Sequence, residues 1–252
     1  FPFVLLFAAL FSAVAFSQTI EILPAIDQPD EADPGTVFTK AFFISNRGSL
    51  QENYTAELML PEGWRIVALD ADPVIPLKSG DTVFVTVYVP PEAVAGAYPV
   101  KLRIHNAETG EETASYSFDL LVREKPGFKI VTIDSPDYAI AGEVYQSLFR
   151  LQNTGNVALE LLIDVDSRPG LDYVSEIRRT ELPAGRSRVF AVSVRSDQSA
   201  AGRIRHTLKL TASDEAGKLR AQDATSTVNI LPRISGEEQP YRTLPVGIAV
   251  KQ

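Results

Sequence analysis

His105 and His206 are the only two side chains in the sequence that could serve as bases near neutral pH. The sequence contains no cysteine, which excludes a thiol nucleophile and any disulfide. The motifs Gly-x-Ser-x-Gly, His-Glu-x-x-His and Gly-x-Gly-x-x-Gly and the phosphate loop are also absent. Two histidines in different parts of the chain, without a clustered partner, do not make a zinc site. The sequence therefore predicts a protein that is not an enzyme, with no catalytic residue, cofactor or metal.

Acidic residues and arginines form two further groups with binding chemistry. The densest carboxylate group lies in Asp27–Asp33, and calcium favours such oxygen clusters, but the spacing matches no calcium loop. Six arginines in the second half could bind carboxylates or phosphates if they shared one face. Interspersed acidic residues favour a mixed, solvated surface instead, and solvation is also the preferred interpretation of the acidic group. The six arginines are Arg178, Arg179, Arg186, Arg188, Arg203 and Arg205.

Trp64 is the single tryptophan and follows a Pro-Glu-Gly bend. Stacking on a sugar would need this ring to be exposed. A lone tryptophan beside a turn more often fills a core, so we expect Trp64 to pack inside the fold.

The elements that must position these side chains are strands, because apolar residues recur with a period of two. Tyr98–Ile104 and Ile204–Leu210 both alternate, and their parity turns His105 outward and His206 inward. Alternate valines of Val83–Val89 form one face of another strand. Gly, Pro and Asn turns recur about every 8–12 residues, and no helical period follows residue 18. The sequence predicts an all-β protein of immunoglobulin-like antiparallel sandwiches.

A repeat of 107 residues divides the chain into two copies. Asn46-Arg47-Gly48 recurs as Asn153-Thr154-Gly155 at that spacing, and the bend before Trp64 recurs around Gly170. Leu77–Gly80 recurs as Leu182–Gly185, slipped by two residues. Several such landmarks in one order indicate a tandem duplication.

The landmarks are turn and core positions. Glycine supplies the positive φ that a tight reversal needs, so we expect Gly48, Gly155 and the glycines of the two Leu-x-x-Gly turns to adopt it. The positions assigned a structural role are Asn46, Gly48, Gly63, Trp64, Gly80, Gly96, Asn153, Gly155, Gly185 and Gly202.

Four segments are expected along the chain. Residues 1–17 read as the apolar part and cleavage site of a signal peptide whose basic start is missing, so the sequence is expected to begin inside that peptide. Residues 18–125 and 126–232 are the two sandwiches, and 233–252 is a linker with the start of a further segment. The signal predicts a bacterial protein exported to the periplasm, the cell surface or the medium.

The net charge of −8 is concentrated in the first copy. Residues 18–125 contain 8 basic and 17 acidic side chains, whereas residues 126–232 contain 13 of each. Without a basic stripe to neutralise phosphates, the chain is not expected to bind nucleic acid. Membrane contact is expected only through parts beyond the sequence, because no segment after the signal approaches the roughly 20 apolar residues of a membrane helix.

The motif order Asn-x-Gly, Leu-Pro-Glu-Gly-Trp, Leu-x-x-Gly and Ala-Gly-x-Tyr over Val37–Val122 resembles the NPCBM-associated, α-galactosidase-associated immunoglobulin-like domain and the wider CARDB group. The second copy lacks the tryptophan but keeps four of the turn residues. The resemblance implies an accessory module of a secreted or surface protein, with no catalytic residue to transfer. In the first copy it is carried by Pro61, Gly63, Trp64, Gly80, Pro90 and Gly96.

Four functions stay open at this point, one of which is a fragment of an outer-membrane assembly whose chain would continue into roughly ten-residue alternating strands. The leading one is a non-catalytic module of a larger exported protein that spaces, adheres to or contacts other proteins or cell-surface components. The second is a periplasmic pilus-type chaperone, which would add a subunit strand to a sheet edge and capture its carboxylate with basic residues such as Lys101 and Arg103. The third is an accessory carbohydrate-binding module of a secreted glycosidase, which would use Trp64.

Overall fold

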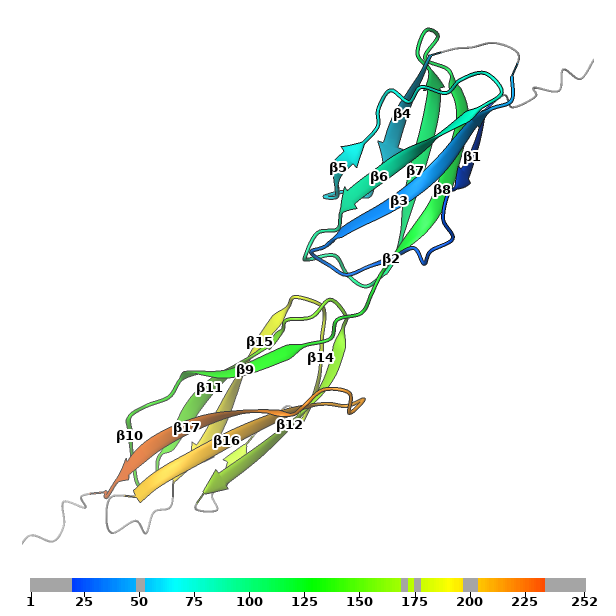
Figure 1. Ribbon diagram of the computed structural model, residues 1–252. Coiled ribbons are helices and arrows are strands. Elements are labelled where there is room, and N and C mark those ends of the chain that lie inside the picture. The colour runs from blue at the N-terminus through cyan, green and yellow to red at the C-terminus, as the bar shows by residue number, and fades with distance from the viewer. Residues whose placement is uncertain (1–19, 49–52, 169–171, 175–177, 197–203, 234–252) are drawn as a thin grey trace, which may run out of the picture. The chain divides into compact units, whose positions relative to one another are not determined.

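The computed structural model describes residues 20–48, 53–168, 172–174, 178–196 and 204–233, and these form strands and turns (Figure 1). The chain divides into two compact units between Lys125 and Pro126. No helix in the described ranges has the length and apolarity needed to cross a membrane. The expected signal peptide, Gly202 and almost all of 233–252 lie outside the described residues.

The first unit is a sandwich of two four-stranded sheets. One sheet has the order β1-β3-β6-β5 and the other the order β2-β8-β7-β4. The strands are β1 (Ile20–Pro24), β2 (Glu31–Ala32), β3 (Val37–Asn46), β4 (Tyr54–Met59), β5 (Arg65–Leu69), β6 (Gly80–Tyr88), β7 (Gly96–Asn106) and β8 (Glu112–Val122).

The second unit repeats this plan with one added edge strand. Its sheets have the orders β13-β15-β11-β9 and β10-β17-β16-β12-β14. The strands are β9 (Phe128–Asp134), β10 (Tyr138–Ile140), β11 (Val144–Asn153), β12 (Leu159–Arg168), β13 (Tyr173–Val174), β14 (Arg179–Leu182), β15 (Ser187–Arg195), β16 (Ile204–Asp214) and β17 (Gln222–Leu231).

Among the described strands, two short parallel pairs interrupt the otherwise antiparallel pairing. β1 pairs with β3 in one sheet, and the chain then crosses so that β2 pairs in parallel with β8 in the other. In the second unit β9 pairs with β11, and β10 pairs in parallel with β17. Each leading segment therefore ties both sheets together, as in immunoglobulin-like sandwiches. The predicted fold class is confirmed.

Each unit has its own apolar core, built from the inward face of alternating strands. Val83, Val85 and Val87 are at most 1% exposed, while Phe84 between them is 57% exposed. The same alternation buries Leu102 and Ile104. The period of two in the sequence thus places side chains on the correct faces.

One inward position is polar in both units. Lys40 on β3 is buried, binds Asp30 through Nζ at 2.5 Å and lies 4.9 Å from the centre of the Phe118 ring. At the equivalent place of the second unit, Ser147 meets two other serine hydroxyls, those of Ser135 at 3.1 Å and Ser226 at 2.9 Å. In both units the buried polar group has a polar partner, because an unpaired polar group is unfavourable in the low dielectric of a core.

Candidate functional site

Asn46 and Asn153 end equivalent strands, β3 and β11, and both are buried. In each, the side-chain Oδ1 accepts a hydrogen bond of 2.9 Å from the backbone N–H of the glycine two residues on, Gly48 or Gly155. Nδ2 of Asn153 also donates to the carbonyl of Leu182 at 2.9 Å. These asparagines hold the turns by hydrogen bonds to the backbone, a role open to few other side chains.

The expected positive φ at Gly48 and Gly155 is not found. Among the described glycines, positive φ occurs at Gly63 and Gly185 of the predicted set, at 80° and 67°, and at Gly96, at 150°. Gly48 and Gly155 need no left-handed backbone, because the asparagine two residues earlier closes each turn.

Gly80 also departs from the expected role of a left-handed turn residue. A Cβ there would come within 2.4 Å of Cζ of Phe43 and 2.7 Å of the Ile44 carbonyl oxygen. Gly80 is required because an aromatic ring and a backbone approach it closely. The left-handed residue of this turn is Lys78, with φ of 56°.

The repeat keeps its spacing of 107 residues through this turn, so the predicted slip of two residues is wrong. Asn46 N–H donates to the Ser79 carbonyl at 2.9 Å, and Asn153 N–H donates to the Arg186 carbonyl at 2.8 Å. Lys78 is therefore the counterpart of Gly185, and both have a positive φ. Aligning the two Leu-x-x-Gly strings by their glycines matched residues with different structural roles.

Trp64 is 9% exposed and packs against Tyr98, with ring centres 5.1 Å apart. The predicted core position of Trp64 is thus found in the structure. A ring buried to this extent offers no platform for a sugar, so the carbohydrate-binding hypothesis cannot rest on Trp64.

The two histidines follow the predicted parity. His206 is buried, and its Nδ1 lies 3.4 Å from the hydroxyl of Tyr145. Burial lowers the pKa of His206 and raises the pKa of Tyr145 to about 12. His105 faces outward, and its Nε2 lies 3.2 Å from Glu57. His105 lies in the first unit and His206 in the second.

The basic residues considered for carboxylate capture are already paired. Lys101 lies 3.3 Å from Glu112, and Nε of Arg103 lies 3.3 Å from the same carboxylate, while Arg103 also approaches Glu57 at 3.8 Å. Two hydrogen bonds lower the pKa of Glu112, the larger effect coming from Ser115 and the smaller from Lys101. On this face of β7 the basic side chains are neutralised by neighbouring glutamates, so the face is not an open anion site.

The acidic group of Asp27–Asp33 also has internal cations. Asp30 binds the buried Lys40, and Asp33 binds Lys125 at 2.7 Å and Arg123 at 2.8 Å. The hydrogen bonds from Lys125 and Arg123 lower the pKa of Asp33. Within the part of the chain that the structure describes, no group of three or more His, Cys, Asp or Glu is arranged to hold a metal ion.

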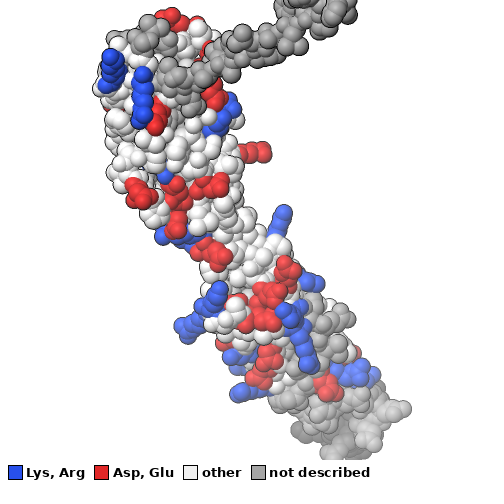
Figure 2. Space-filling model, turned by 90° about the vertical axis from the view of Figure 1, so that its right-hand side faces the viewer, with Lys and Arg blue, Asp and Glu red and all other residues white. Residues whose placement is uncertain are grey.

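The arginines of the second unit are dispersed over several elements, and two of them, Arg179 and Arg188, bind partners within the unit. Arg179 on β14 binds Glu160 at 2.5 Å and Glu215 at 2.7 Å, and Arg188 donates to Oγ1 of Thr180 at 2.9 Å. Figure 2 shows basic and acidic side chains interspersed over the face of this unit that it displays. Arg203 lies outside the described residues.

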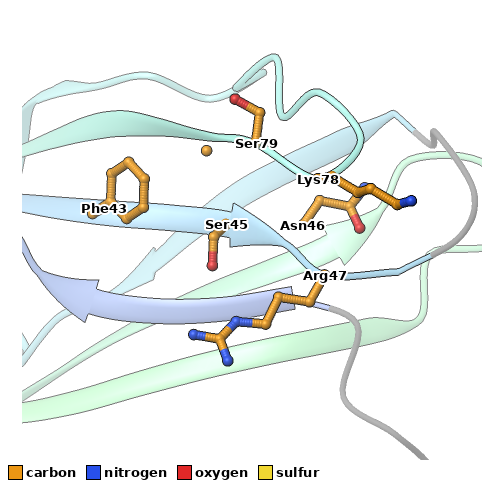
Figure 3. A pocket seen from close by; sticks show the side chains of 7 residues that line it. Phe43, Ser45, Asn46, Arg47, Lys78 and Ser79 are labelled. Carbon is orange, nitrogen blue, oxygen red and sulfur yellow. The ribbon is translucent and has the colours of Figure 1, made fainter.

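An open depression at the end of β3 is the candidate site, and sequence reasoning missed it. Its volume is about 520 Å³. Phe43 and Lys78 lie at opposite ends, with Arg47 along the β1 side (Figure 3). Arg47 pairs with Glu21 of β1, whereas Lys78 has no ion pair among the described residues. The residues that line the depression are Phe43, Ser45, Asn46, Arg47, Lys78, Ser79 and Gly80.

The residues that shape the depression differ in the second unit. Over the constant spacing of 107 residues, Phe43 is replaced by Arg150, Lys78 by Gly185 and Gly80 by Ser187 in the second unit. The second unit therefore lacks the aromatic ring, the lysine and the glycine that make room for the ring. The available signals in the sequence were an aromatic residue at an outward position of β3 and a lysine where the other copy has glycine.

Comparison with known proteins bears on the first unit. Residues 32–106 match the family model described as the NPCBM-associated, NEW3 domain of alpha-galactosidase. This match confirms the resemblance predicted from the motifs of the first copy. A search of the curated proteins found no matching sequence.

Three solved structures illustrate the structural matches. The CARDB domain of a Pyrococcus furiosus protein, in complex with di-metal ions, is 13% identical, with 42% of this chain and 89% of that chain covered and a TM-score of 0.35. A Salmonella alpha-2-macroglobulin mutant is 14% identical, with 84% of this chain and 16% of that chain covered and a TM-score of 0.35. A FixG-related protein from Vibrio parahaemolyticus is 13% identical, with 43% and 97% covered and a TM-score of 0.33.

Proposed function

We propose, from the NEW3-type match of residues 32–106, that this chain is a non-catalytic module of an exported bacterial protein. Its two sandwiches space other parts of that protein and present surfaces that contact proteins or cell-surface components. The matched domain is an accessory one, which agrees with a supporting rather than a catalytic role.

The observation that carries the proposal is that the two units share the same turn geometry but differ in surface residues. Asn46 and Asn153 make the same turn bonds, and Lys78 and Gly185 take the same left-handed conformation. On the outside, Phe43, Lys78 and Gly80 of the depression are replaced by Arg150, Gly185 and Ser187 in the second unit. Selection that keeps scaffolds and varies their surfaces is expected of interaction modules.

Strand addition of the pilus-chaperone type has less support. Lys101 and Arg103 are bound to Glu57 and Glu112, so they are not available to capture a terminal carboxylate. The edge strand β5 is also irregular, with a register shift between Ile66 and Ala68. A bulge of this kind protects a sheet edge from pairing with another strand.

The proposal is tested by sedimenting the purified chain with bacterial cell-envelope material and by assaying it for hydrolysis of glycosides and peptides. We expect saturable retention by the envelope, loss of that retention after heat unfolding, and no turnover. Turnover that co-purifies with the folded chain would contradict the proposal, and so would the absence of any saturable retention.

A further inference from the structure

We propose that the depression around Phe43 and Lys78 binds an acidic saccharide, a pyranose whose carboxylate is held by the cations of the rim. The inference rests on the proposed function, since it names one ligand class for a contact surface of the first unit. Its volume of about 520 Å³ lies within the roughly 300–1,000 Å³ of small-molecule sites.

Lys78 gives the first argument, because its backbone is strained where a glycine would not be. Its φ of 56° is left-handed, a conformation that is unfavourable for a residue with a side chain, and the counterpart Gly185 avoids this cost. Strain kept at a position where the sister unit uses glycine indicates that the side chain has a use. That side chain supplies a positive charge beside the depression.

Charge gives the second argument. Residues 18–125 contain 17 acidic and only 8 basic side chains, yet two of the basic ones, Arg47 and Lys78, border this single depression. Elsewhere in the unit, Lys40, Lys101 and Arg103 are bound to carboxylates. The pair at the depression carries two positive charges against the one carboxylate of Glu21, so it favours an anionic ligand.

The floor gives the third argument. The Phe43 ring lies over Gly80, where any Cβ would meet Cζ of Phe43 at 2.4 Å, and Phe43 stays 42% exposed. An exposed ring provides a face for the C–H groups of a sugar. Ser45 and Ser79 line the same depression, and a serine hydroxyl can both donate to and accept from a ligand rich in hydroxyls.

The backbone argues against a peptide added as a strand. β3 is a central strand, in which Ser45 pairs with Glu21 on one side and with Gly80 on the other. Phe43 is likewise paired on both sides. The backbone donors and acceptors beneath the depression are therefore used within the sheet, and recognition falls to side chains.

The test is isothermal titration of the purified chain with tetragalacturonate and with its methyl ester, which has the same sugar rings without the charges. We expect tetragalacturonate to bind and esterification to weaken binding at least tenfold. Lys78→Asn should weaken binding about tenfold without unfolding, because asparagine tolerates the left-handed conformation. Phe43→Leu should weaken it as well, and Lys78→Arg should retain it. Lys218→Asn, which removes an exposed lysine of the second unit, is the matched control and should change nothing.

Three results would overturn the inference. The first is equal binding of the charged and esterified sugars, and the second is binding that survives both Lys78→Asn and Phe43→Leu. The third is binding of a peptide with a C-terminal phenylalanine in place of the sugar, which would assign the depression to a peptide carboxylate. Retention of Lys78→Asn by cell-envelope material, measured beside these titrations, shows whether the proposed function stands when this site fails.

Discussion

Asn46 and Asn153 are the residues whose importance the sequence indicated most directly. They are buried polar side chains, and their turn bonds are the same in both units. An asparagine supplies a donor and an acceptor on one short side chain, so it can bond the backbone on both sides of a turn. No apolar residue of similar size can satisfy these backbone groups.

Asn153→Ala is expected to lower the free energy of unfolding of the second unit by about 2–3 kcal/mol, because buried backbone groups lose their partners. Those groups include the carbonyls of Val157 and Leu182, which accept from Nδ2 at 2.7 and 2.9 Å. Urea unfolding followed by circular dichroism measures the change. Asn229→Ala, whose side chain bonds the Asp137 carbonyl at a more accessible place, should cost less than about 1 kcal/mol. Equal losses in the two variants would contradict this account.

His206 should make the stability of the second unit depend on pH. Burial lowers its pKa in the folded protein, so the unfolded chain binds a proton at higher pH than the folded chain does. The contribution of neutral His206 is complete above its ordinary pKa of about 6.5 and is lost as the pH falls through the lowered value. The free energy of unfolding should therefore decrease between pH 7.5 and 5.

The control for this pH dependence is His206→Gln, which keeps a polar group beside Tyr145 and cannot titrate in this range. Urea unfolding at several pH values between 7.5 and 5 should give a smaller decrease for this variant than for the natural chain. The same decrease in both would assign the pH dependence to other groups.

At the scale of the elements, the meeting of β3 and β6 shapes the candidate site. Gly80→Ala should destabilise the first unit by about 1–3 kcal/mol, because the new Cβ meets both the Phe43 ring and the Ile44 carbonyl oxygen. The double variant Gly80→Ala, Phe43→Ala should recover only part of the loss, since the contact with the carbonyl stays. Ser187→Ala, at the equivalent place on β15, is the control and should cost less than about 0.5 kcal/mol. Thermal unfolding measures all three, and a harmless Gly80→Ala would refute the close approach.

The elements also show what the sequence could and could not predict. The alternation of Val83–Val89 and of Tyr98–Ile104 fixed the faces of β6 and β7, because a strand's side chains must alternate. The turn at Lys78 was missed, because a left-handed lysine has no signal in composition or period. The depression was missed for a related reason, since it is lined by Phe43 and Lys78, which are 35 positions apart in the sequence.

At the scale of the whole molecule, the two units share one fold but have separate cores. Among the described residues, the core of the first unit is built from residues between Ile20 and Val122, and the core of the second from residues between Phe128 and Ile230. The buried polar position shows how far they have diverged, with an ion pair of Lys40 in one and serine hydroxyls around Ser147 in the other. Because each described core is built from residues of its own unit, each unit has the means to fold by itself.

We therefore expect residues 18–125 and 126–233, produced separately, each to fold into a β-sheet structure with a cooperative unfolding transition. Asn153→Ala should lower the transition of the second piece only, and Gly80→Ala that of the first only, because each change acts within one core. Circular dichroism and urea unfolding of the two pieces and of the whole chain provide the measurement. If one piece stays unfolded alone and folds when joined to the other, the cores are not independent. The two units would then have to be treated as one cooperative structure rather than as two modules.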